Sequence, residues 1–78
     1  IHLETGVTTG DREEAAIKNL IARQAAETVV LATREKLGAA SPYQIMPLGD
    51  VGTLVTVSDL GEEVLAPFRS SHLTAVEA

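Results

Sequence analysis

The sequence predicts an α/β fold, a partial Rossmann-like parallel sheet with flanking helices. Two observations favour it: helical and strand patterns alternate along the chain, and the strand patterns are continuous apolar runs. Such runs are typical of strands that are covered on both faces, as in parallel sheets. The expected order of elements is helix, strand, connection, strand, helix and strand, which is the order that a parallel α/β sheet requires.

The first helix is expected over residues 11–26. Asp11 can cap its start, and Glu14, three residues later, completes the pattern of a capping box. Apolar residues at helical spacing predict its buried side: Ile17, Leu20, Ile21 and Ala25. The polar residues that fall largely on the other side are Arg12, Lys18, Asn19 and Arg23.

The strands of the sheet are expected at residues 29–32, 52–57 and 72–76. A short or edge strand is expected over residues 43–48, because Pro47 has no N–H to donate to a neighbouring strand. A turn is expected between the first strand and Gly38.

The second helix is predicted by a repeat of the capping pattern, in which Asp59 precedes Glu62 by three residues. Pro67 should kink or end this helix, because proline removes a backbone donor and its ring clashes with the preceding turn. The residues expected on its buried side are Leu60, Val64 and Phe68.

Length and charge exclude several classes of protein. A chain of 78 residues forms one domain at most, and a net charge of -5 repels a phosphate backbone, so any contact with DNA must come from elsewhere. The chain has no cysteine, no glycine-rich nucleotide loop and no cluster of metal-ligand types, so neither a metal nor a cofactor is expected. No apolar run approaches a membrane span, which predicts a soluble protein. The first residues open in mid-pattern without an initiator Met, which suggests a piece of a longer protein.

Two stretches are candidates for anion binding. In GVTTG, residues 6–10, two threonines stand between glycines just ahead of a helix start, where hydroxyl and backbone N–H groups can donate to an anion. Lys36 follows a core strand, at the edge of an α/β sheet where ligands bind. The alternatives are a plain capping turn and a solvated surface charge. Glu14 and Lys18 are four residues apart, which predicts an ordinary surface ion pair.

The chain resembles the effector domain of the DeoR family of bacterial transcriptional repressors. The resemblance begins with GVTTGDREEAAIKNLIARQAAETVVLATREKLG. It continues through MPLGDVGTLVTVSDLGEEVLAPFRSSHLTAVEA, so that it covers nearly all of the chain. Family members commonly read Gly-x-Thr-Thr, then Glu-Ala and Lys, an apolar helix, and a strand that ends in Leu-Ala-Asp-Ser-Ser-Lys-Phe-Gly.

The resemblance implies a cytoplasmic, homo-oligomeric sensor of a phosphorylated sugar, related in fold to ribose-phosphate isomerases and CoA transferases but without their catalysis. Residues 1–78 would be the carboxyl-terminal portion of the sensor domain, and the winged helix-turn-helix domain that binds DNA would be absent from this chain. Carried over by position, the effector-binding residues would be Gly6, Thr8, Thr9, Glu14, Lys18 and Lys36.

The chain departs from the family pattern at the ends of two strands. Thr33 stands where the family usually has Asp, and Val57 stands at its second Asp, so two acceptors for sugar hydroxyls are missing. Arg34 and Glu35 replace two serines, and Arg34 either adds a cation for phosphate or fills the pocket. The alternative function is a dimerisation or structural half-domain whose pocket has decayed. A phosphosugar isomerase would need an acid or base over the sugar, and Glu14 is better explained as a helix cap, so no enzyme is expected.

Overall fold

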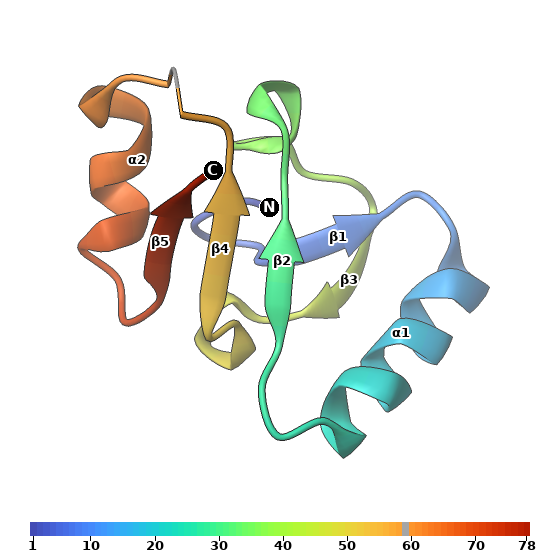
Figure 1. The fold of residues 1–78 in the computed structure, drawn as a ribbon. Coiled ribbons are helices and arrows are strands. Elements are labelled where there is room, and N and C mark those ends of the chain that lie inside the picture. Colours follow the sequence, from blue (N-terminus) through green and yellow to red (C-terminus); the bar gives the residue numbers. More distant parts are fainter. Residues whose placement is uncertain (59) are drawn as a thin grey trace.

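The computed structural model describes residues 1–58 and 60–78. Figure 1 shows the helices and strands along the chain: β1 (Val7–Thr9), α1 (Arg12–Gln24), β2 (Val29–Leu31), β3 (Tyr43–Met46), β4 (Thr53–Thr56), α2 (Glu62–Arg69) and β5 (Thr74–Glu77). Two single 3-10 turns follow β2 and β3: η1 (Arg34–Lys36) and η2 (Leu48–Asp50).

The predicted parallel sheet is confirmed. Its strands lie in the order β2-β4-β5, and both neighbouring pairs are parallel. A second, antiparallel pair was not predicted: β1, expected as a loop, pairs with β3, the expected short strand. In Figure 1 this β1–β3 ribbon passes behind β2. The ribbon carries the glycine-threonine stretch, residues 6–10, to the sheet.

The first helix is confirmed, and its cap is only half of the predicted box. The carboxylate of Asp11 accepts the backbone N–H groups of Glu13 and Glu14, at 2.9 and 3.1 Å. The reciprocal bond from the Glu14 side chain is replaced by contacts of Glu14 with Thr9 and Lys18. The Glu14 side chain therefore contacts Thr9 and Lys18 and does not cap the helix.

The predicted buried side of α1 is wrong. Ile17 and Ile21 are 60% and 63% exposed, and Leu20 and Ala25 are exposed too. The helix packs on the β1–β3 ribbon through its other side, which positions 12, 15, 19 and 22 share. Ala15 is buried there, and the Asn19 side chain donates a hydrogen bond to the Ile45 carbonyl. Arg12 stacks over the Tyr43 ring. The small side chain of Ala15 lets the helix lie close to the ribbon, and the apolar side with Ile17 and Ile21 faces outward.

The second helix is confirmed, with two corrections. It continues past Pro67, its sixth residue, to Arg69, because the proline removes only one backbone donor, so of the predicted kink or end the end is wrong. Val64 is 37% exposed, and Leu65, one position further on, is buried in its place. Leu60 and Phe68 are buried as expected. The predicted cap at Asp59 lies outside the described residues.

One face of the sheet covers the core and the other is open. Alternate strand residues, among them Ala32 and Leu54, belong to the buried cluster between the sheet, the ribbon and α2. On the opposite face Leu31 is 79% exposed and Val29 53%. The prediction that these strands are covered on both faces is wrong for the described residues. The β1–β3 ribbon and α2 both pack on the same face of the sheet. We call the residues of the uncovered side the open face: Val29, Leu31, Val55 and Val76.

We expect the isolated chain to associate with itself through the open face, since exposed apolar rows on an unpaired parallel sheet favour burial against another surface. Leu31→Lys should reduce this association and change the free energy of unfolding by no more than about 0.5 kcal/mol, because the side chain is already exposed. Sedimentation velocity over a dilution series measures the association, with Gln24→Lys, at another exposed position, as the charge control. A monomer at every concentration would contradict the expectation.

A candidate anion site at the carboxyl end of β2

A close backbone contact places the amino-terminal residues. His2 and Gly6 exchange two backbone hydrogen bonds, of 2.9 and 2.8 Å, and so close a tight turn. Gly6 has a φ of +75°, and a Cβ on it would lie 2.3 Å from the Met46 carbonyl oxygen. Only glycine fits this position, because a side chain would meet both the left-handed strain and the backbone at the end of β3. The contact sets where β1 begins.

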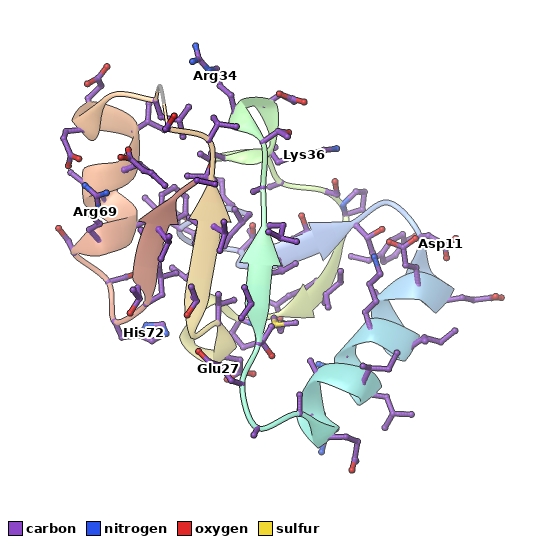
Figure 2. The ribbon with its side chains drawn as sticks, in the orientation of Figure 1. Asp11, Glu27, Arg34, Lys36, Arg69 and His72 are labelled. Carbon is purple, nitrogen blue, oxygen red and sulfur yellow. The ribbon has the colours of Figure 1, made fainter. Side chains whose placement is uncertain are left out.

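The same segment is bound to the turn that follows β2. The Ile1 amine donates to the Lys36 carbonyl at 2.8 Å, and the Gly38 N–H donates to the Ile1 carbonyl at 2.8 Å. The turn that carries Lys36 therefore lies beside the start of the chain. Figure 2 shows the Lys36 side chain extending from this turn toward the side of the molecule where α1 begins, which Asp11 marks.

These contacts enclose a hollow of about 400 Å³. Its apolar lining comes from the amino terminus, β1, β2 and β3: Ile1, Val7, Val30, Leu31, Ala32 and Ile45. Beside Gly10, its polar lining consists of Thr8, Thr9, Glu14, Lys18, Lys36 and Ser41. We call it the charged hollow. Its two lysines face one glutamate, so its side chains carry a surplus of one positive charge.

Five of the six residues expected at the effector site line the charged hollow, although they come from three separate elements, β1, α1 and η1. Gly6 is the exception, since it is buried and supports the turn next to the hollow. Ser41 was missed: its backbone N–H donates to the Thr8 hydroxyl at 2.8 Å. Nothing in the sequence around Ser41 marks it, because its role depends on a contact between distant segments.

Glu14 links two of the polar groups. Its carboxylate accepts the Lys18 ammonium at 3.1 Å and the Thr9 hydroxyl at 3.0 Å. Lys18 first, and Thr9 second, lower the pKa of Glu14 below its ordinary value. The predicted surface ion pair is confirmed, and both of its side chains are exposed. Glu14 is thus an ionised hydrogen-bond acceptor at the rim of the hollow.

Lys36 contributes positive charge at the opposite side. Burial lowers the pKa of the Ile1 amine, and the charge of Lys36 lowers it further, which reflects how close the two cations lie. No ion pair of Lys36 occurs among the described residues. By contrast, the N–H groups of the first turn of α1 are bonded to Asp11. Lys36 is therefore the stronger candidate for binding an anion here.

A second hollow of about 240 Å³ adjoins the first at the carboxyl ends of β2 and β4. We call it the terminal hollow; its lining residues are Leu31, Ala32, Thr33, Val55, Thr56, Val57 and Ala78. Leu31 and Ala32 line both hollows. Thr33 and Val57, the two departures from the family pattern, line the terminal hollow and do not line the charged hollow.

The described residues offer neither a metal cluster nor a membrane span. No three of their His, Asp and Glu side chains are arranged so that they could hold a metal ion. Neither α1 nor α2, within the described part of the chain, is long and apolar enough to cross a bilayer.

Three curated proteins are similar to this chain. One is the HTH-type transcriptional regulator GlpR of Haloferax volcanii, 30% identical over 77 residues, which are 99% of this chain and 30% of GlpR. Another is a putative sgc region transcriptional regulator of Escherichia coli K12, 28% identical over 88% of this chain and 26% of its own length. The HTH-type transcriptional repressor GlcR of Bacillus subtilis is 34% identical over 68% of this chain and 20% of GlcR. No solved structure matches.

The family comparison agrees with these relatives. Residues 1–58 match the family described as DeoR C terminal sensor domain, a stretch that includes every residue with a polar side chain in the charged hollow. The chain spans between 20% and 30% of the length of the curated relatives that it matches. This chain belongs to the DeoR family of transcriptional regulators, in the part that forms their C-terminal sensor domain.

Proposed function

We propose that the charged hollow binds the phosphate group of a phosphorylated sugar, and that these residues are the carboxyl-terminal portion of a repressor's sensor domain. The observation that carries the proposal is the convergence of Lys36, Lys18 and the hydroxyls of Thr8 and Thr9 in one hollow. A surplus positive charge suits an anion, and hydroxyl groups suit the remaining oxygens of a sugar. In this proposal the hollow senses and does not catalyse.

Within the site the lysines and the carboxylate have separate tasks. Lys36 pairs with the phosphate, because its ammonium lies at the end of β2 and forms no ion pair among the described residues. Glu14 accepts a sugar hydroxyl, which takes the place of the Thr9 hydroxyl now bonded to it. Thr8 already accepts the Ser41 N–H, so its own hydrogen is oriented away from that bond and can donate to the ligand.

Binding would control DNA through the rest of the protein. The chain is acidic, with a net charge of -5, and the named relatives are regulators of which it spans less than a third. We therefore assign DNA binding to a helix-turn-helix domain outside these residues. The open face gives the sensor a second surface, which is consistent with a homo-oligomer.

The alternative of a half-domain with a decayed pocket has less support. It rested on the loss of acidic residues at Thr33 and Val57, and both lie in the terminal hollow. The charged hollow keeps its lysines, its carboxylate and its hydroxyls. The open face supports a role in association, but such a role is compatible with sensing.

Lys36→Met should weaken the binding of a phosphorylated sugar by about 10- to 150-fold, because a charge-assisted hydrogen bond is lost. Binding of the free sugar should hardly change. Calorimetry on the intact protein compares glucose 6-phosphate and ribose 5-phosphate with glucose and ribose. Arg23→Met, which removes a cation outside the charged hollow, is the matched control. Equal losses for phosphorylated and free sugars, or no loss for either, would return Lys36 to the role of a surface charge.

Lys18→Met should raise the pKa of Glu14 toward its ordinary value, and Thr9→Val should raise it by less, because Lys18 contributes the larger part of the lowering. A folded pKa below the unfolded value stabilises the fold above the unfolded pKa, and this stabilisation is lost as pH falls through the folded pKa. In Lys18→Met the stabilisation should therefore be smaller, and its loss should be complete at a higher pH. Carboxyl carbon NMR shifts during an acid titration measure the pKa directly. An unchanged Glu14 titration in both variants would show that neither contact holds in solution.

A further inference from the structure

Residues 39–42 connect η1 to β3 and contain no helix or strand. Two contacts fix the ends of this connection. The Gly38 N–H donates to the Ile1 carbonyl at 2.8 Å, and the first residue of β3 is paired with Thr9 of β1. The connection therefore ends beside the glycine-threonine stretch, and its residue Ser41 lines the charged hollow.

The Thr8 hydroxyl accepts a hydrogen bond from this connection. The Ser41 backbone N–H donates to the Thr8 Oγ1 at 2.8 Å, across 33 positions of the chain. A hydroxyl group has one hydrogen and two lone pairs, so the hydrogen of Thr8 must point away from the Ser41 nitrogen. Within the described part of the chain the Thr8 hydroxyl makes no other hydrogen bond, so this hydrogen is available to a ligand in the hollow.

The neighbouring Thr9 hydroxyl is occupied in both directions. It donates to the Glu14 carboxylate at 3.0 Å and accepts the Asp11 backbone N–H at 3.4 Å. The two threonines therefore differ in what they offer, although both line the charged hollow. Of the two, only Thr8 has an unused hydrogen, and the direction of that hydrogen depends on a backbone group of a distant segment.

A donor with a fixed direction suits a phosphate oxygen. Threonine is β-branched, so its χ1 angle is stiff, and the freedom that remains is the rotation of the hydroxyl hydrogen. The Ser41 N–H restricts this rotation before a ligand arrives, and a ligand that meets a pre-oriented group loses less entropy on binding. Ionised phosphate oxygens carry no hydrogen, so they can only accept, and hydrogen bonds to charged acceptors are stronger than those to neutral ones.

We propose that Ser41 is a positioning residue of the charged hollow, whose backbone N–H holds the Thr8 hydroxyl as a donor to the phosphate group of a bound sugar phosphate. The inference rests on the proposed function, because the phosphate must bind in the charged hollow. Ser41 acts through its backbone and not through its side chain. Thr8 then adds a directed hydrogen bond to the positive charge that Lys36 supplies.

A double-mutant cycle on the intact protein tests this inference by calorimetry, with whichever of glucose 6-phosphate and ribose 5-phosphate binds more tightly. Ser41→Pro removes the N–H, and the extended backbone that Pro42 imposes on residue 41 is one that proline can adopt. We expect Ser41→Pro to weaken binding about 3- to 10-fold, because the Thr8 hydrogen then spreads over three staggered positions and water competes for it. Thr8→Val should weaken binding about 10- to 150-fold, and adding Ser41→Pro to it should have no further effect.

Two matched variants serve as controls. Ser41→Ala keeps the N–H and should leave binding unchanged. Thr9→Val makes the same substitution at a threonine that Ser41 does not contact, so Ser41→Pro should keep its full effect in that background. The Ser41 amide gives a second readout that needs no substitution at Ser41: its proton NMR resonance should move upfield in Thr8→Val and stay in place in Thr9→Val.

The inference is overturned if Ser41→Pro leaves binding unchanged, or weakens it as much in Thr8→Val as in the unsubstituted protein. Equal losses in Ser41→Pro and Ser41→Ala would also overturn it, because the side chain would then be the contact. An unmoved Ser41 amide in Thr8→Val does so even where Ser41→Pro fails to fold. In each of these cases the proposed function stands if Lys36→Met still weakens binding. If neither sugar phosphate binds, the inference fails together with that function.

Discussion

Gly6 lies so close to the backbone at residues 46–48 that a methyl group on it would overlap the Met46 carbonyl oxygen. This contact joins the turn at residues 2–6 to the end of β3, and the β1–β3 ribbon continues from it. The ribbon brings Thr8 and Thr9 to the carboxyl end of β2. The chain start, bonded to Lys36 and Gly38, brings the lysine to the same place. The charged hollow is thus a consequence of one tight backbone contact.

The sheet edge then divides into two chemically different surfaces. On one side of the end of β2, two lysines and a carboxylate surround hydroxyl groups, which suits a phosphate and a polyol. On the other side, the terminal hollow is lined mainly by aliphatic side chains of β2, β4 and the residue that follows β4. The open face lies on the side of the sheet away from the core, and it shares Leu31 and Val55 with the terminal hollow.

Elements with strong local signals were predictable from the sequence: the cap at Asp11 fixed the start of α1, and the apolar runs located β2 and β4. The orientation of α1 was not, because the small residue Ala15 packs inward while Ile17 and Ile21 face outward, against the usual rule. Periodicity identifies an apolar side but not which layer covers it. The family resemblance named five residues that line the charged hollow, whereas Ser41 and the terminal hollow depend on contacts between distant segments.

The free energy of unfolding of three glycine variants tests most directly whether the contact at Gly6 holds the structure together. Gly49→Ala meets open space at an ordinary φ, Gly38→Ala meets open space at a φ of +83°, and Gly6→Ala adds the overlap with Met46 to a φ of +75°. The account predicts a small change for Gly49→Ala, a loss of about 1–3 kcal/mol for Gly38→Ala from backbone strain, and a clearly larger loss for Gly6→Ala. Equal losses for Gly6→Ala and Gly38→Ala in urea unfolding would contradict it, because the close approach would then contribute nothing.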